Sequence, residues 1–446
     1  AIGRAALYSN TTGTQNTAIG RDAVRTNTTG SYNVGVGRDA LYYNETGVSN
    51  TAVGTDALQK NTTGDENVAV GHDCLDANTT GNYNVAVGKE ALSANTTADN
   101  NTAIGTTALL ANTTGTGNTA VGQSSLKANT TGDSNTAVGR VALFTNTTGG
   151  NNTAVGKSAL HTNSTGANNT AVGDSSLYAN INGDNNVAIG LNALTANTDA
   201  DYNTAVGATA LAANTTGERN TAIGYAALTT TNYANNTTPN DNTALGYEAL
   251  RDNTHGYGNT AIGSGCLDEN VTGNYNTAIG HAALANNLHG DSHVAIGNLA
   301  LNSLTTSNGG CVAIGTQAAK SNISGDNTVA IGAVALYDLT TGDNNTAVGD
   351  NALRKCVDGS ENVALGYQAG YAVTSGANNL FLGYQAGRTA SPSGEVTTGS
   401  NIICLGDNNV TDLYCADTSI SSSDSRDKTD VVNFTHGLNW INQLNP

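Results

Sequence analysis

The side chains that could take part in catalysis or metal binding are few and scattered in this 446-residue chain. His281, His289 and His293 come close together, but they stand at different positions of a 17-residue repeat and would not converge on one ion. Glycoside hydrolysis needs two carboxylates at a defined separation in a cleft, whereas the acidic residues here stand singly. The sequence therefore predicts no metal site and no cofactor.

The cysteines form no C-x-x-C pair and stand at 74, 266, 311, 356, 404 and 415. Cys74 and Cys266 replace an Ala of the repeat, so we expect them to be small buried side chains. Cys404 and Cys415 lie outside the regular array, where a disulfide between them is one alternative.

Many N-x-[ST] sequences, such as Asn61-Thr62-Thr63, recur at the same position of the repeat. In a eukaryotic secretory setting they would form a file of glycosylation acceptors. The alternative is a turn that needs Asn, Thr and Gly for its own geometry, with the Asn side chains stacked in ladders. The turn accounts for the same residues in any host.

These residues belong to a unit of 17 residues that fills nearly the whole chain and reads N-T-A-[IV]-G-x-x-A-L-x-x-N-T-T-G-x-x. We number its positions from 0 to 16, as from Asn16 to Tyr32. Five extra residues enter within 229–241. A short fixed period is typical of a solenoid, in which each unit buries its apolar side chains against its neighbours.

Each unit contains three local signals. Positions 1 to 3 are β-branched or small and end at Gly, which predicts one short strand. Positions 7 and 8, usually Ala and Leu, fit either a second strand or a single helical turn. The N-T-T-G segment at positions 11 to 14 is typical of a turn. The predicted fold class is therefore all-β, a parallel β-solenoid of 17-residue coils.

Stacking places like residues above like residues about 4.8 Å apart. We expect a stacking core made by two sets of aliphatic residues, namely Ile19, Val36, Val53, Leu41 and Leu58. The small Ala at positions 2 and 7 implies a close approach of the backbone across a thin core, and Asn at positions 0 and 11 implies polar ladders. Because a single coil has little core, we expect three copies to associate into a homotrimeric rod.

The charge excludes several partners. The net charge is -18 with 12% charged residues, which argues against nucleic acid and against a polybasic membrane contact. No run of 18 apolar residues occurs, so we expect no membrane insertion.

The repeat pattern predicts three segments: a solenoid shaft at 1–387, an irregular neck at 388–422 and a different C-terminal segment at 423–446. The last segment begins S-D-S-R-D-K-T-D and continues with an apolar stretch. It resembles the start of the C-terminal intramolecular chaperone domain of bacteriophage tail fibres, tail spikes and endosialidases.

In that family the S-D-x-R-x-K motif opens a domain that trimerises the fibre, and many members then cut themselves. The resemblance implies that Ser423 would be the nucleophile, that Lys428 would activate it, and that the bond cut would join Ser423 to Asp424. Apart from this self-cleavage, no enzyme activity is expected.

The N-T-A-[IV]-G units resemble those of phage fibres that carry the same chaperone domain. They are also similar to the shorter repeats in the heads of trimeric autotransporter adhesins, which form left-handed parallel β-rolls. The two resemblances imply a tail fibre of a virion, extracellular, that binds a host cell-surface receptor, either a glycan or a protein.

Three alternatives remain open. The first is a bacterial cell-surface adhesin of trimeric autotransporter-like build. The second is a polysaccharide depolymerase, which would need a cleft with two carboxylates. The third is an ice-binding solenoid, which the repeated Thr-Thr pairs suggest. Against it, these pairs stand in a turn that ends in Gly, and not in the alternating T-x-T pattern of a flat ice-binding face.

Overall fold

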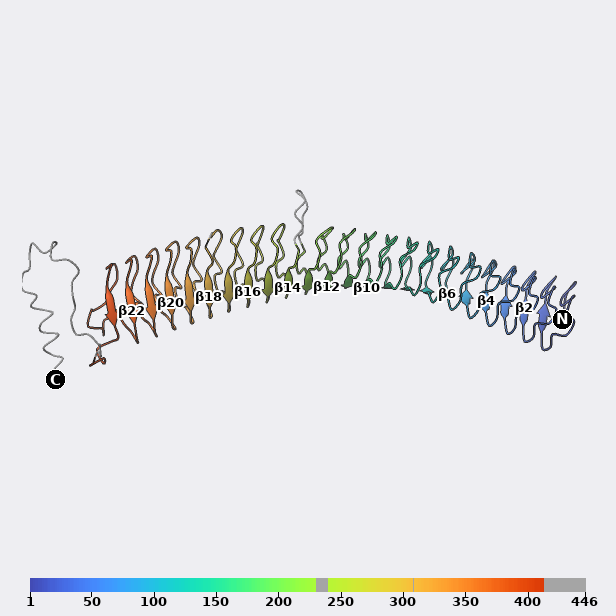
Figure 1. The fold of residues 1–446 in the computed structure, drawn as a ribbon, viewed down its shortest axis with the longest axis horizontal. Coiled ribbons are helices and arrows are strands. Elements are labelled where there is room, and N and C mark those ends of the chain that lie inside the picture. Colours follow the sequence, from blue (N-terminus) through green and yellow to red (C-terminus); the bar gives the residue numbers. More distant parts are fainter. Residues whose placement is uncertain (230–239, 308, 413–446) are drawn as a thin grey trace, which may run out of the picture. The chain divides into compact units, whose positions relative to one another are not determined.

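A computed structural model of the protein describes residues 1–229, 240–307 and 309–412. Every strand in these residues has three residues and parallel neighbours, and the described part contains no helix. One coil of the chain corresponds to one 17-residue unit, which confirms the all-β parallel solenoid (Figure 1). The chain divides into two compact units, 1–308 and 309–446.

The first unit contains the strands β1 to β17. Their bounds are β1 Thr17–Ile19, β2 Val34–Val36, β3 Thr51–Val53, β4 Val68–Val70, β5 Val85–Val87, β6 Thr102–Ile104, β7 Thr119–Val121, β8 Thr136–Val138, β9 Thr153–Val155, β10 Thr170–Val172, β11 Val187–Ile189, β12 Thr204–Val206, β13 Thr221–Ile223, β14 Thr243–Leu245, β15 Thr260–Ile262, β16 Thr277–Ile279 and β17 Val294–Ile296.

The second unit contains the strands β18 to β23. Their bounds are β18 Val312–Ile314, β19 Val329–Ile331, β20 Thr346–Val348, β21 Val363–Leu365, β22 Leu380–Leu382 and β23 Ile403–Leu405. Strand β23 pairs with β22 although it lies beyond residue 387, so the stack continues into the segment expected to be a neck.

Within each unit the strands pair in parallel with equivalent residues opposite one another. Thr17 lies opposite Val34, and Ala18 lies opposite Gly35. The partners belong to successive coils of the same chain, so each coil advances by one strand spacing, about 4.8 Å. We call the residues at one position of successive coils a column.

The segment at positions 5 to 8 is neither a second strand nor a helical turn. Its backbone enters the left-handed region at positions 6 and 8, with φ of 56° at Asp22 and 53° at Val24. The Asp22 N–H donates to the Arg4 carbonyl of one neighbouring coil at 2.9 Å, and the Val24 N–H donates to the Ala40 carbonyl of the other at 2.9 Å. Helical dihedrals would direct these N–H groups along their own coil, whereas here they satisfy both neighbours.

The core is thinner than the sequence suggested. Ala18 and Ala23 are fully buried, as are Leu41 and Leu58, which confirms the expected role of positions 2, 7 and 8. The prediction for position 3 is wrong, because Ile19 is 41% exposed.

Val53 is 37% exposed and Val36 is only half-buried, so both depart from the predicted core in the same way. Successive strand residues point to opposite sides of a sheet. Since the small Ala at position 2 points inward, positions 1 and 3 must point outward.

Candidate interaction surface

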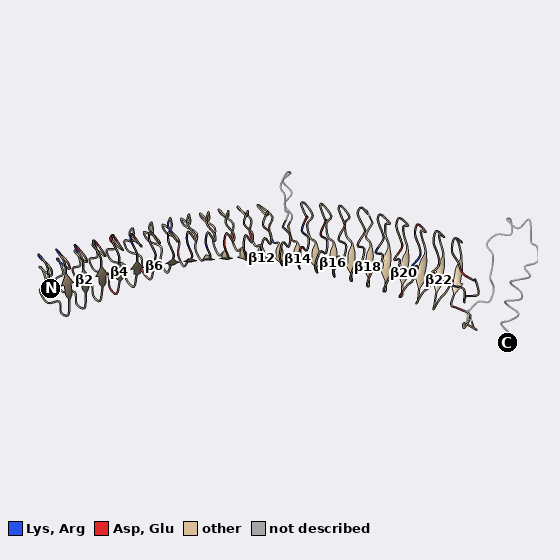
Figure 2. Ribbon diagram, turned by 180° about the vertical axis from the view of Figure 1, so that it is seen from behind, with Lys and Arg blue, Asp and Glu red and all other residues tan. Residues whose placement is uncertain are grey.

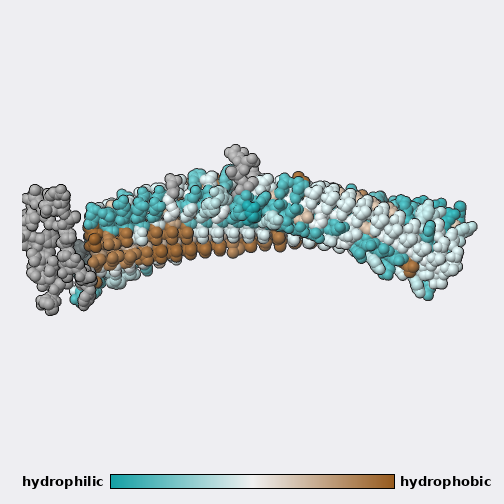
Figure 3. All heavy atoms as spheres, in the orientation of Figure 1, coloured by the Kyte–Doolittle hydropathy of each residue, from teal (hydrophilic) through white to brown (hydrophobic). Residues whose placement is uncertain are grey.

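The outward side of the strands is an uncharged surface of aliphatic and Thr side chains, which we call the strand face. It consists of the residues at positions 1 and 3, which flank the buried Ala of each strand. In β11, Ala188 is fully buried whereas Ile189 is 40% exposed. Figure 3 shows this surface as a brown stripe along the strands of the second unit and along the later strands of the first.

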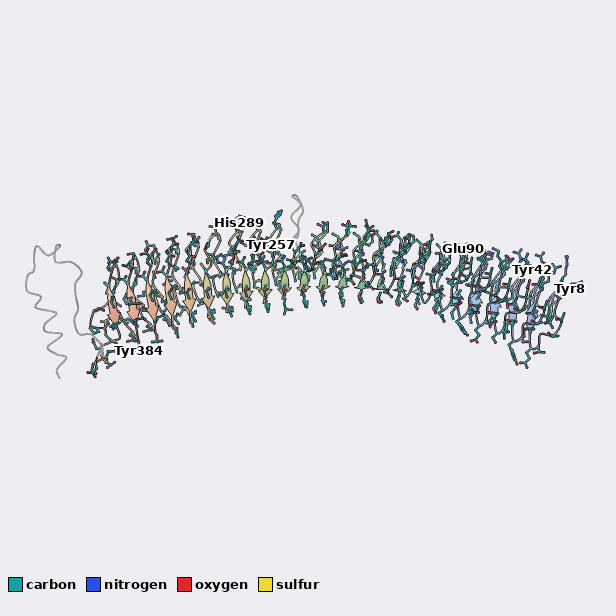
Figure 4. The ribbon with its side chains drawn as sticks, in the orientation of Figure 1. Tyr8, Tyr42, Glu90, Tyr257, His289 and Tyr384 are labelled. Atoms are coloured by element: carbon teal, nitrogen blue, oxygen red, sulfur yellow. The ribbon has the colours of Figure 1, made fainter. Side chains whose placement is uncertain are left out.

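The strand face carries no charged residue, because positions 1 to 3 of every strand are Thr, Val, Ile, Leu, Ala, Gly, Phe or Cys. Lys, Arg, Asp and Glu lie on the loops, while the strands are uniformly tan (Figure 2). Tyr42 and His289 project on the loop side of their coils, and Tyr384 lies on the strand side (Figure 4). The two sides of a coil therefore differ sharply in polarity.

The Asn columns form the expected ladders and hold the N-T-T-G turn closed. At position 11, the Asn27 amide nitrogen donates to Asn10 Oδ1 at 2.7 Å and to the Gly30 carbonyl at 2.9 Å. At position 0, Asn16 Oδ1 accepts from the Asn33 backbone N–H at 2.9 Å, and its amide nitrogen donates to the Gly30 carbonyl at 2.8 Å.

The Asn of each N-x-[ST] sequence stands at position 11 and is interpreted either as a glycosylation acceptor or as a turn residue. Its side chain is fully buried in the folded coil, as at Asn61. A glycan attached to its amide nitrogen would have to replace hydrogen bonds that close the turn. The geometry therefore favours the turn interpretation for the folded coil.

Among the residues that the structure describes, one group of ligand-type side chains occurs, and it lies in the first unit. Atoms of Asp56, His72 and Asp73 lie within 4.8 Å of one another. Asp56 is already held by Arg38, with Nη2 to Oδ2 at 2.8 Å, and His72 Nδ1 lies 2.7 Å from Asp73 Oδ2. A cation beside Asp56 would compete with the Arg38 guanidinium, which already pairs with that carboxylate.

The three neighbouring histidines belong to different columns, as the sequence predicted. His281 Nδ1 lies 3.3 Å from Asn298 Nδ2, and His289 Nδ1 lies 2.9 Å from Thr272 Oγ1. His293 takes the place of the position-0 Asn and is fully buried. They do not form one site.

A second charged group surrounds Arg251. Its guanidinium contacts Asp252 at 3.0 Å, Asp268 at 3.2 Å and Glu248 at 3.3 Å. Burial raises the pKa of Asp268 to about 6, and Arg251 opposes that shift. Asp268 Oδ1 is buried and accepts no hydrogen bond, which fits a carboxylate that is costly to ionise.

The cysteines among the described residues are all buried: Cys74, Cys266, Cys311, Cys356 and Cys404. Burial raises the pKa of Cys74 to about 12, and it raises the pKa of Cys266 and of Cys356 to the same value. A thiol with so high a pKa is a weak nucleophile near neutral pH. These cysteines serve as small apolar side chains.

The residues assigned to self-cleavage, Ser423, Asp424 and Lys428, lie outside the described residues, as does Cys415. Residues 230–239, most of the insertion, also lie outside them.

At the last coil, a shallow hollow of about 400 Å³ is lined by Leu382, Tyr384, Leu405, Asp407 and Val410. One carboxylate in an apolar hollow does not provide the pair that glycoside hydrolysis needs.

No protein-family model matches the chain, and a comparison with curated proteins finds no significant match. Within residues 1–229, 240–307 and 309–412, no helix has the length and apolarity needed to cross a membrane.

Proposed function

We propose that this protein is a structural fibre of a virion that binds a host cell surface, assembled as a homotrimer through the strand face. The observation that supports it best is an uncharged surface of aliphatic and Thr side chains that follows the strands of a repetitive solenoid, with Val, Ile or Leu at position 3 of every strand. Contiguous exposed apolar surface of this kind marks an interaction site. A fibre that repeats the same coil presents weak contacts many times, so that they add through multivalency.

The S-D-x-R-x-K resemblance at 423–428 supports the phage fibre over a bacterial adhesin, because in its family that motif begins a trimerising domain. The same resemblance implies release by cleavage between Ser423 and Asp424. An intact mass of the purified chain tests this step, since Ser423→Ala would abolish the cleaved product if Ser423 is the nucleophile.

The assembly is tested with two substitutions of the same residue type. Ile189 at position 3 is 40% exposed on the strand face, and Ile181 at position 12 is 42% exposed on the turn. We expect Ile189→Lys to shift the trimer toward monomer in light scattering with an unchanged circular dichroism spectrum, because three ammonium groups would be desolvated at the interface. Ile181→Lys is the matched control and should remain trimeric.

A wild-type chain that is monomeric by light scattering and in electron micrographs would reject the trimer. Equal dissociation by Ile181→Lys would show that the strand face is not the interface.

A further inference from the structure

The described residues of the second unit carry their positive charge on one edge of the coils. Its described residues contain four basic side chains, Lys320, Arg354, Lys355 and Arg388. Three of them stand at position 9 and Lys355 at position 10. Although the chain as a whole is acidic, with a net charge of -18, these cations are gathered on neighbouring columns.

The position-9 column alternates cations and tyrosines over five successive coils, as Lys320, Tyr337, Arg354, Tyr371 and Arg388. We call these five residues the cation–tyrosine column. Tyr337 lies between Lys320 Nζ, 5.5 Å from the ring centroid, and Arg354 Cζ, at 5.8 Å. Tyr371 lies between Arg354 Cζ at 5.9 Å and Arg388 Cζ at 4.6 Å. The rings therefore hold the guanidinium groups in fixed orientations.

Further contacts fix the column. Arg354 Nη1 donates to Tyr371 Oη at 3.3 Å, and Arg388 donates to the side-chain oxygen of Gln368. Lys355 Nζ lies 5.3 Å from the Tyr371 ring centroid, beside the column. Side chains that are already ordered lose little conformational entropy on binding a ligand.

None of the four cations forms an ion pair with a carboxylate among the described residues of the second unit. Arg25, at position 9 of the first unit, is different. Arg25 also stacks on a tyrosine, Tyr42, at 5.4 Å, but its Nη1 lies 3.4 Å from Asp22 Oδ1. Among the described residues, the cations of the cation–tyrosine column therefore have no carboxylate at ion-pair distance and can pair with an external anion, whereas Arg25 already has such a partner.

We propose that the cation–tyrosine column binds a linear acidic polysaccharide, with carboxylate or sulfate groups on the cations and sugar hydroxyl groups on the tyrosine hydroxyls. Cations recur at every second coil, about 10 Å apart, with a phenol between them. A guanidinium binds a carboxylate or sulfate through two parallel hydrogen bonds. This inference rests on the proposed function and names the class of host-surface ligand.

Two other polyanions fit the column less well. Single-stranded nucleic acid binds by stacking bases on free aromatic faces, and both faces of Tyr371 are covered by Arg354 and Arg388. An extended acidic peptide repeats its side chains on one face at about 6.6 Å, which matches neither one coil spacing nor two.

The test measures binding of the whole chain to four immobilised polymers by interferometry: polygalacturonate, dextran sulfate, neutral dextran and polyglutamate. We expect binding to at least one of the two acidic polysaccharides and none to dextran. Polygalacturonate binding alone would identify carboxylates as the anion, and dextran sulfate binding alone would identify sulfates. Polyglutamate that binds as tightly as the polysaccharides, or no binding to either acidic polysaccharide, would overturn the proposal.

The variants Arg354→Gln and Arg388→Gln should each weaken binding about tenfold, the usual effect of losing a charge-assisted hydrogen bond. Lys355→Gln changes an exposed side chain and should give a smaller loss without risk to folding. Arg25→Gln is the matched control, at the same position and on the same kind of ring, and should bind as the wild type does. Unchanged binding by the Arg354→Gln and Arg388→Gln variants, or an equal loss with Arg25→Gln, would overturn the assignment.

Failure of this inference is distinguishable from failure of the proposed function. A trimeric chain that attaches to cells but binds no acidic polysaccharide would contradict the inference alone. A monomeric chain that binds polygalacturonate through Arg354 would contradict the fibre alone.

Discussion

The amide nitrogen of Asn61 donates to Oδ1 of Asn44 in the preceding coil at 2.8 Å, and the same nitrogen donates to the Gly64 carbonyl at 2.9 Å. Asn61 Oδ1 in turn accepts from the Asn78 amide at 2.9 Å. One side chain therefore closes its own turn and joins three coils. Because Asn61 is fully buried, every one of these groups depends on its partner.

Replacing Asn61 with Asp should destabilise the solenoid by about 2 to 4 kcal/mol, because two buried acceptors lose their donor and a carboxylate faces Asn44 Oδ1. Thermal unfolding followed by circular dichroism measures the effect. The matched control is Asn82→Asp in the next coil. At that position the side chain accepts the Asp65 backbone N–H at 2.8 Å and donates to Asp99 Oδ1 at 3.3 Å. A carboxylate keeps the first bond, and successive Asp residues already occupy this column at Asp184 and Asp201. A similar loss for both variants would contradict the ladder argument.

Gly54 should not tolerate a side chain. Its φ is 141°, and a Cβ would lie 2.3 Å from the Gly71 carbonyl oxygen of the next coil. We expect Gly54→Ala to cost at least about 2 kcal/mol, from backbone strain and the clash together.

The control for Gly54→Ala is Gly265→Ala. Gly265 has φ of 61° with nothing within 4 Å of its Cβ, and other coils place side chains there. This change should stay within about 1 kcal/mol, and denaturant titration would compare the two. Equal stability of both variants would contradict the close approach of the coils.

Thiol reactivity should report the integrity of the core. Because burial raises the pKa of Cys74 and of Cys266 to about 12, the native protein should react with a thiol reagent far more slowly than the denatured protein at pH 8. Mass spectrometry after labelling identifies the modified residues. Rapid native labelling of Cys74 would show that its coil opens.

The raised pKa of Asp268 should be detectable in the pH dependence of the protein's stability. Its pKa is raised from 3.8 to about 6, so the folded state favours the protonated form, and stability falls as the pH rises from about 4 through 6. Relative to the wild type, Asp268→Asn should therefore gain melting temperature over this range.

Asp241 serves as a control because its effect on stability should change with pH in the opposite direction. Hydrogen bonding to Arg219 lowers the pKa of Asp241 below 3.8, so the wild type gains stability as the pH rises toward and above that value. Asp241→Asn should lose melting temperature relative to the wild type above pH 4. Parallel pH profiles for the two variants would reject both assignments.

The repeat alone predicted most of the fold. The spacing of Asn16, Asn33 and Asn50 gave the coil length, and the β-branched run before Gly gave one strand per coil. Asn at two positions predicted both ladders, and Ala with Leu predicted the buried residues. These features follow from sequence because identical units can stack only with like residues above one another.

The tertiary structure decided which residues of the unit point into the core and which point to solvent. A three-residue strand has two sides, and the thin core admits Ala18 while Ile19 is turned outward, so the aliphatic strand face became visible only in three dimensions. A strand with Ala between two β-branched residues was the signal that could have shown it.

The left-handed backbone at Leu41, with φ of 53°, is held by hydrogen bonds to other coils that no local pattern encodes. In the same way, Arg354 and Tyr371 are 17 residues apart in the chain and become neighbours because one coil returns the chain to the same edge. The amino-acid sequence by itself determined the type of residue in each column, and the stacking of the coils determined which columns face solvent together.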